Sequence, residues 1–118
     1  MVPARLRPAS YADVRDALAA DPRSAEQTRL LVKHFLAVLS ERAPGASVEV
    51  RVPPYAAVQV VPGVRHTRGT PPAVVELDAP TWIALATGAT TWSAAFDEGR
   101  IRASGERADL SAYLPLAP

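Results

Sequence analysis

Two stretches in the last third of the chain decide the fold: VELDAPTWIALATG at residues 75–88 and TWSAAFDEGRIRASGERADLSAYLPL at residues 91–116. The first opens with apolar residues that alternate with a glutamate, which is typical of a strand with one buried face, and we expect this strand over 73–77. Asp78 then follows as a helix N-cap, and Gly88 ends the helix. The first stretch therefore predicts a strand joined directly to a helix.

The second stretch predicts a helix, a strand and another helix. Thr91 is placed to cap the first of these helices, and Gly99 ends it. In the strand expected over 100–104, apolar residues alternate with arginines, so one face is buried and the other faces water. A last short helix is expected over 108–114.

The N-terminal part of the chain predicts two helices. Ser10 is placed to cap a short helix over 11–20. Ser24 and Gln27 have the spacing of a capping box for a longer helix over 25–42. Its apolar stripe recurs at spacings of three and four residues and consists of Leu31, Phe35, Val38 and Leu39.

Between these helices and the last third, the apolar period changes from 3.6 residues to two. We expect strands over 47–52 and 55–61, joined by a turn at Pro53-Pro54. The charged residues on the outer faces of the strands are expected to form cross-strand pairs, and they are Glu49, Arg51, Glu76, Arg100 and Arg102. The pattern favours a mostly antiparallel sheet that is covered on one side and solvated on the other.

These elements resemble the sterol carrier protein type 2 family, especially its short stand-alone bacterial members. The likeness lies in the strand and helix closed by Gly88, in the helix that ends at Gly99 before a strand, and in the turn at Ser104-Gly105. The resemblance implies an α+β, sterol-carrier-like fold with a mostly antiparallel five-stranded sheet and helices packed on one face. It also implies an apolar tunnel for fatty acyl chains, sterols or similar lipids.

Seven apolar or aromatic side chains are candidates to line the cavity that the resemblance implies. These candidates are Val58, Val60, Leu85, Trp92, Phe96, Leu110 and Tyr113. The alternative for the aromatic residues, Trp82 among them, is plain core packing, because large aromatics dominate the interior of small domains.

The segment PGVRHTRGTPP at residues 62–72 is long for a connection between two strands. It gathers Arg65, His66 and Arg68, whose side chains suit a carboxylate or phosphate, so an anionic head group is one candidate ligand. The alternative is a solvated, proline-stiffened loop with a short edge strand around 64–67.

The sequence contains no recognisable catalytic arrangement. There is no cysteine, and the six glycines form no phosphate-binding loop. His34 lies beside the apolar stripe of its helix without a carboxylate or second histidine at metal-ligand spacing, so a structural, hydrogen-bonded role is expected. We predict no catalytic residues, no metal and no cofactor.

The charge balance and the apolar runs of the chain limit the kinds of partner that we expect. Thirteen basic and twelve acidic residues leave a net charge of +1, which gives no indication of a nucleic-acid partner. No apolar run approaches the length of a membrane span, so stable membrane insertion is not expected. We expect a flexible N-terminal leader over 1–9, a single domain over 10–118 and a cytoplasmic protein; the oligomeric state stays open.

Two functions are hypotheses at this point. The first is a non-catalytic carrier that binds an apolar or amphipathic small molecule, such as a lipid, a fatty acyl chain or a sterol-like compound. The second is an accessory domain that acts through protein–protein contacts and has no ligand of its own. A filled cavity favours the carrier, whereas a packed core with an exposed apolar patch favours the protein partner.

Overall fold

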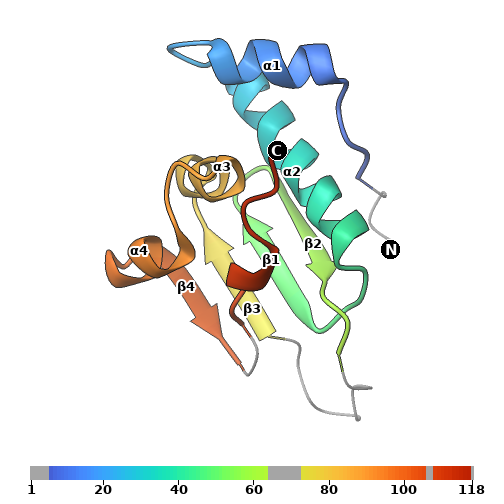
Figure 1. Cartoon of the computed structure of the whole chain (residues 1–118), viewed down its shortest axis with the longest axis vertical. Coiled ribbons are helices and arrows are strands. Elements are labelled where there is room, and N and C mark those ends of the chain that lie inside the picture. Colours follow the sequence, from blue (N-terminus) through green and yellow to red (C-terminus); the bar gives the residue numbers. More distant parts are fainter. Residues whose placement is uncertain (1–5, 64–72, 106–107, 118) are drawn as a thin grey trace.

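The computed structural model describes residues 6–63, 73–105 and 108–117. Its elements are α1 (Tyr11–Ala19), α2 (Ala25–Arg42), β1 (Val48–Val52), β2 (Ala56–Val60), β3 (Ala73–Leu77), α3 (Ala79–Thr87), α4 (Trp92–Asp97), β4 (Ile101–Ser104) and the 3-10 turn η1 (Ser111–Tyr113). Figure 1 shows one sheet with α2 and α3 beside it, and α1 lying farthest from the sheet, at the top of the view.

The four strands of the described residues form one mixed sheet in the order β2-β1-β3-β4. β1 is antiparallel to β2, and β3 is antiparallel to β4, but the central pair of β1 and β3 is parallel. The α+β class is therefore confirmed. The expected sheet of five mostly antiparallel strands is corrected to four strands with a parallel central pair.

The parallel pair arises from the side of β1 on which the third strand is placed. β2 returns along β1 and ends with Val60 opposite Val48. β3 begins at the same end of the sheet, with Ala73 opposite Val48, but on the other side of β1. It therefore runs in the direction of β1, and alternation of apolar and polar residues cannot reveal which neighbour a strand takes.

The two faces of the sheet differ as the alternation predicts. Val48, Val50 and Val52 of β1 are fully buried, while Arg51 between them is exposed. On the outer face Glu76 lies opposite both Arg51 and Arg102 in the strand register, although the ion pair formed there joins Arg51 to Glu49 on the same strand at 2.6 Å. The fifth predicted member, Arg100, precedes β4 and pairs with Glu98 at 3.4 Å.

The helix ends follow their local signals. Ser24 accepts from the backbone N–H of Gln27 while the Gln27 side chain accepts from the backbone N–H of Ser24, so the capping box of α2 is complete. Asp78 caps α3, and Gly88 ends it in the left-handed conformation at φ 82°. The predicted bounds of α2 and α3 are confirmed.

The last predicted helix, over 108–114, is corrected to the single 3-10 turn of η1. After this turn the chain continues as an extended segment that packs by tertiary contacts. Leu116 is fully buried, and its backbone N–H donates to the carbonyl of Ala86 in α3 at 2.8 Å. Its own carbonyl accepts from the Arg42 guanidinium of α2 at 2.7 Å. The C-terminal segment thus bridges α2 and α3.

The core lies between the sheet and the helices and is built around Trp82. This side chain is fully buried, and its indole N–H donates to the backbone carbonyl of Val32 in α2 at 3.3 Å. Leu31, Phe35 and Leu39 of the α2 stripe are also buried, and Val38 packs against them from a partly exposed position.

Candidate functional site

An open apolar groove of about 580 Å³ lies where α1, α2 and the C-terminal segment meet. The lining residues are Ala9, Tyr11, Val14, Arg15, Leu18, Ala19, His34, Phe35, Leu116 and Ala117. Its apolar wall comes from three places that are far apart in the sequence. Its volume lies within the roughly 300–1,000 Å³ that is common for small-molecule sites.

Three side chains with polar groups line this groove: Tyr11, Arg15 and His34. Tyr11 is 79% exposed, and the guanidinium of Arg15 lies 5.9 Å from the centre of its ring, within range of a cation–π interaction. No carboxylate side chain is among the lining residues. The groove therefore suits a molecule with an apolar body and a hydrogen-bond acceptor at one end.

His34 is held by a hydrogen bond from outside its helix. Its Nδ1 accepts from the backbone N–H of Ala9 at 2.9 Å, and its ring meets that of Phe35 edge-on with centroids 4.9 Å apart. Burial lowers the pKa of His34 below its ordinary value, and the negative charge of Glu41 opposes that shift. The expected structural, hydrogen-bonded role of this histidine is what the geometry shows.

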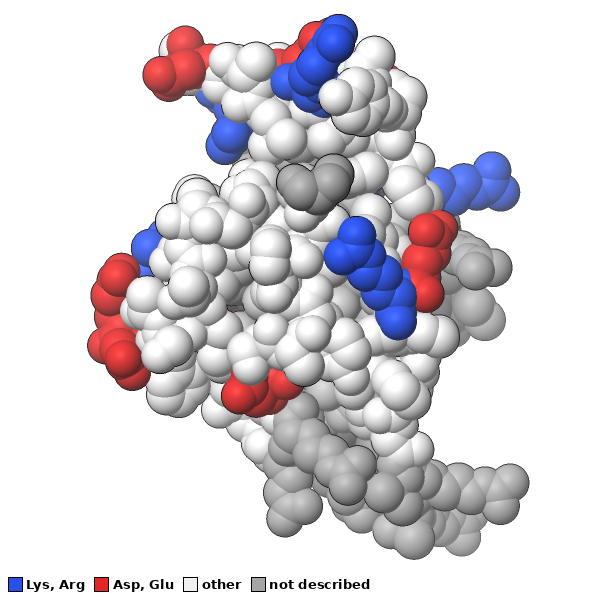
Figure 2. Space-filling model, viewed as in Figure 1, with Lys and Arg blue, Asp and Glu red and all other residues white. Residues whose placement is uncertain are grey.

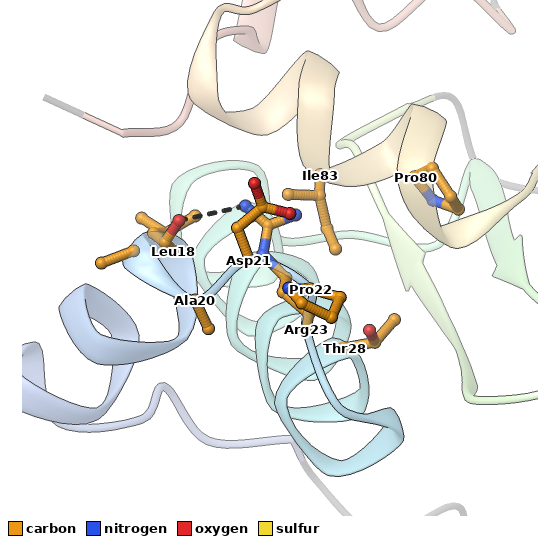
Figure 3. A pocket seen from close by; sticks show the side chains of 9 residues that line it. Leu18, Ala20, Asp21, Pro22, Arg23, Thr28, Pro80 and Ile83 are labelled. Carbon is orange, nitrogen blue, oxygen red and sulfur yellow. Dashed lines mark hydrogen bonds between the residues drawn. The ribbon is translucent and has the colours of Figure 1, made fainter.

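A second hollow of about 550 Å³ lies between the α1–α2 turn and α3 (Figure 3). It shares Leu18 and Ala19 with the apolar groove, so the two hollows flank the C-terminal end of α1. Arg23 crosses this region, and its guanidinium donates to the carbonyls of Ala17 at 3.0 Å and Leu18 at 3.3 Å. These bonds satisfy backbone carbonyls at the end of α1, so the Arg23 guanidinium already has hydrogen-bond partners within the protein. With Asp21, Arg23 and Thr28 in its lining, the second hollow is more polar than the apolar groove.

Two of the seven candidate cavity residues lie together in a third hollow. Trp92 and Phe96 of α4 line a groove of about 510 Å³ with Ala108 and Asp109. Phe96 is 52% exposed, whereas Trp92 on the same helix is only 9% exposed.

The other five candidates lie elsewhere. Val60, Leu85 and Leu110 are fully buried in the core, and Val58 and Tyr113 are partly buried against it. Among the described residues, these five line neither the apolar groove, nor the hollow between the α1–α2 turn and α3, nor the hollow beside Trp92. The candidate anion-binding residues Arg65, His66 and Arg68 lie outside the described residues.

Val14 and Leu18 of α1 line the groove but are not among the site residues that the sequence predicts. The spacing of Tyr11, Val14 and Leu18 was the available signal, since residues three and four apart share a helix face. The contribution of Leu116 had no local signal, because an extended segment shows no periodicity and this residue packs by long-range contacts.

A fourth hollow, with a volume of about 380 Å³ and several charged lining residues, lies beside the ends of β3 and β4. Arg100 lines it and donates from Nε to the hydroxyl of the fully buried Thr81 at 3.1 Å. Hydrogen bonds from Thr81, led by that from its side chain, lower the pKa of Asp78, and the charge of Arg100 adds to this. The arginine is thus part of a helix-capping network.

In the part of the chain that the structure describes, neither charged patches on the face viewed nor metal-ligating groups indicate a further site. Figure 2 shows acidic and basic side chains interspersed on the face viewed, without a large patch of one sign. Among residues 6–63, 73–105 and 108–117, no group of three or more acidic or histidine side chains is arranged to hold a metal ion. No helix in the described part of the chain is long and apolar enough to cross a membrane.

A comparison with known protein families shows to which family the chain belongs. The family model described as bacterial SCP ortholog, where SCP denotes sterol carrier protein, matches residues 24–116. The chain belongs to this family. The match to the bacterial SCP orthologs begins at Ser24, the N-cap of α2, and ends at Leu116 in the C-terminal segment, so α1 lies outside the matched residues. A comparison with curated proteins gives no match.

Proposed function

We propose that this bacterial SCP ortholog is a non-catalytic carrier that binds an apolar or amphipathic small molecule in the groove between α1, α2 and the C-terminal segment. The observation that supports this best is the make-up of the groove, which is mostly apolar and has three donor-bearing side chains. Membership of the SCP family agrees with a lipid-carrier role.

The physical basis of binding is the transfer of the apolar part of the ligand out of water. Val14, Leu18 and Phe35 offer aliphatic and aromatic surface to it, and each buried CH2 group contributes about 0.8 kcal/mol. Arg15 and Tyr11 lie at the same groove and supply donors for an acceptor group at the end of the ligand. The apolar wall therefore provides affinity, and the donors provide orientation.

The first experiment is native mass spectrometry of gently purified protein, followed by organic extraction of any bound molecule. A reproducible added mass that proves to be a lipid supports the carrier. A second measurement is a fluorescence titration with dansyl-labelled undecanoic acid. Absence of any added mass, together with no binding of the labelled acid, contradicts the carrier function.

Two alanines in the C-terminal part of the chain allow a matched test of location. Ala117 lines the apolar groove and Ala108 lines the hollow beside Trp92, and both are partly buried against the core. We expect Ala117→Trp to fill the groove and weaken binding of the labelled acid at least tenfold, about 1.4 kcal/mol, while Ala108→Trp leaves it unchanged. If Ala108→Trp weakens binding and Ala117→Trp does not, the binding site lies in the hollow beside Trp92 and Phe96.

An accessory role through protein contacts is the second candidate, and one observation favours it. Phe96 is 52% exposed on α4, where a large apolar side chain in water suits contact with another chain. This function predicts that Phe96→Ser abolishes capture of a partner protein while the variant keeps its fold. If the protein binds lipid and captures no partner protein, the accessory role is excluded.

A further inference from the structure

α1 is attached to the rest of the molecule unequally at its two ends. At its C-terminal end Ala17 is fully buried, and Arg23 donates to the carbonyls of Ala17 and Leu18. At its N-terminal end Tyr11 is largely exposed. Less apolar surface of α1 is therefore buried at its N-terminal end, although Leu6 in the preceding segment packs partly buried against the core.

The N-terminal end is tied to α2 by one long-range hydrogen bond, from the N–H of Ala9 to Nδ1 of His34. Ala9 immediately precedes Ser10, the N-cap of α1, and both Ala9 and His34 line the groove. The bond thus joins the start of α1 to the opposite wall of the binding groove.

This bond exists in one protonation state only. A nitrogen that accepts a hydrogen bond carries no proton, so neutral His34 holds its single proton on Nε2. When the ring takes up a second proton, both nitrogens become donors, and Nδ1 can no longer accept from Ala9. Protonation therefore replaces an attraction between two groups by a contact between two donors.

Charged groups of both signs lie on the elements around His34, so some favour its protonated form and others oppose it. On α2, Lys33 is the sequence neighbour of His34, and Glu41 favours its charged form. Arg15, together with Tyr11, faces the same groove from α1. Arg7 belongs to the segment that carries Ala9, and the C-terminal segment contributes Leu116 and Ala117, whose side chains do not titrate.

We propose that the hydrogen bond between Ala9 and His34 is a pH-sensitive latch on the groove: protonation of His34 releases Ala9, α1 separates from α2 at its N-terminal end, and the bound molecule leaves faster. The inference rests on the proposed function, because it assigns regulation to the same groove. The lowered pKa of His34 keeps the latch closed at neutral pH. The segment that moves lies outside the residues shared with the SCP family.

The latch is tested first by NMR between pH 7 and pH 5, without ligand. We expect the nitrogen shifts of the imidazole to report a proton on Nε2 at neutral pH. The amide shift of Ala9 is expected to follow the titration of His34, and its protection from hydrogen exchange to fall about fivefold, as loss of one net hydrogen bond implies. An Ala9 amide that does not follow the titration overturns the latch.

Two substitutions separate proton uptake from the loss of an acceptor. His34→Asn places an amide oxygen near Nδ1 without a titrating group, so we expect Ala9 to stay protected at both pH values. His34→Ala removes the acceptor, so Ala9 is expected to be unprotected at both. Persistence of the wild-type pH step in either variant assigns the step to another group and overturns the proposal.

The dissociation rate of dansyl-labelled undecanoic acid connects the latch with the groove. It is expected to rise about fivefold from pH 7 to pH 5 in the wild type and to stay constant in His34→Asn. A constant rate in the wild type overturns the latch. If the labelled acid binds at no pH, the carrier function fails, while the NMR titration of Ala9 still decides whether the hydrogen bond responds to pH.

Discussion

Two side chains have lowered pKa values, His34 in α2 and Asp78 at the N-cap of α3, and different forces act on them. For His34 the main cause is burial, which disfavours the charged ring. For Asp78 it is hydrogen bonding from Thr81, which favours the charged carboxylate. Both pKa values are lowered from their ordinary values, which are 6.5 for histidine and 3.8 for aspartate.

The stability of the protein is predicted to respond to Asp78 only in acid. Because the folded pKa of Asp78 is below its ordinary value of 3.8, its contribution is present above that pH and is lost as the pH falls through the folded pKa. Asp78→Asn should remove this loss of stability at low pH. At pH 7 it should change the free energy of unfolding by less than about 0.5 kcal/mol, because asparagine caps helices nearly as well.

Urea unfolding at several pH values measures this effect. Between pH 7 and pH 5 the unfolding free energies of wild type and Asp78→Asn should change in parallel, because both proteins contain His34. In that range the lowered pKa of His34 means that the unfolded chain takes up its proton first, so stability falls as the pH drops below about 6.5. Curves that stay parallel below pH 4 would contradict the role of Asp78.

At the scale of elements, α1 and α2 begin with similar signals but differ in how firmly they are held. Ser10 accepts from one backbone N–H of α1, at Asp13, whereas Ser24 and Gln27 exchange two bonds at the start of α2. α1 has one fully buried residue, Ala17, while α2 has six. α2 is therefore part of the core, and α1 is a cover over one face of it.

The two caps are predicted to affect stability differently. Ser24→Ala should lower the free energy of global unfolding by about 1 kcal/mol, because α2 unfolds only with the core. Ser10→Ala should leave global unfolding nearly unchanged and should raise hydrogen exchange in α1, since weakly packed elements open locally. Urea unfolding combined with hydrogen exchange measures both, and equal global losses would show that α1 and α2 unfold as one unit.

At the scale of the whole molecule, the C-terminal segment joins parts that the sheet does not connect. Leu116 is fully buried between α2 and α3, and it lines the groove that also involves α1. Leu114, two residues earlier, is only partly buried against the core. Two leucines of one extended segment thus have different environments.

The different burial of these two leucines predicts different losses of stability when each is replaced by alanine. Leu116→Ala should cost about 2–5 kcal/mol of unfolding free energy, because it removes buried apolar surface and leaves a cavity. It should also weaken binding of dansyl-labelled undecanoic acid, since it removes part of the groove wall. Leu114→Ala should cost clearly less, and urea unfolding compares the two. Equal losses would contradict the bridging role of Leu116.

The elements whose signals are local can be read from the amino-acid sequence alone. The capping box at Ser24, the Asp78 cap and Gly88 act within a few residues, and the alternation in β1 follows from the two faces of a strand. For the same reason the family likeness was visible in the last third of the chain, where such signals are dense.

Features that depend on contacts between distant residues become visible in the three-dimensional structure. The place of β3 beside β1 follows from the path of the chain between them, and the extended course after η1 follows from packing against α2 and α3. The candidate groove joins Tyr11, His34 and Leu116, and no pattern of spacing along a chain encodes such a meeting. Five of the seven side chains predicted to line a cavity are buried or partly buried in the core, and apolar residues with the same periodicity serve either purpose.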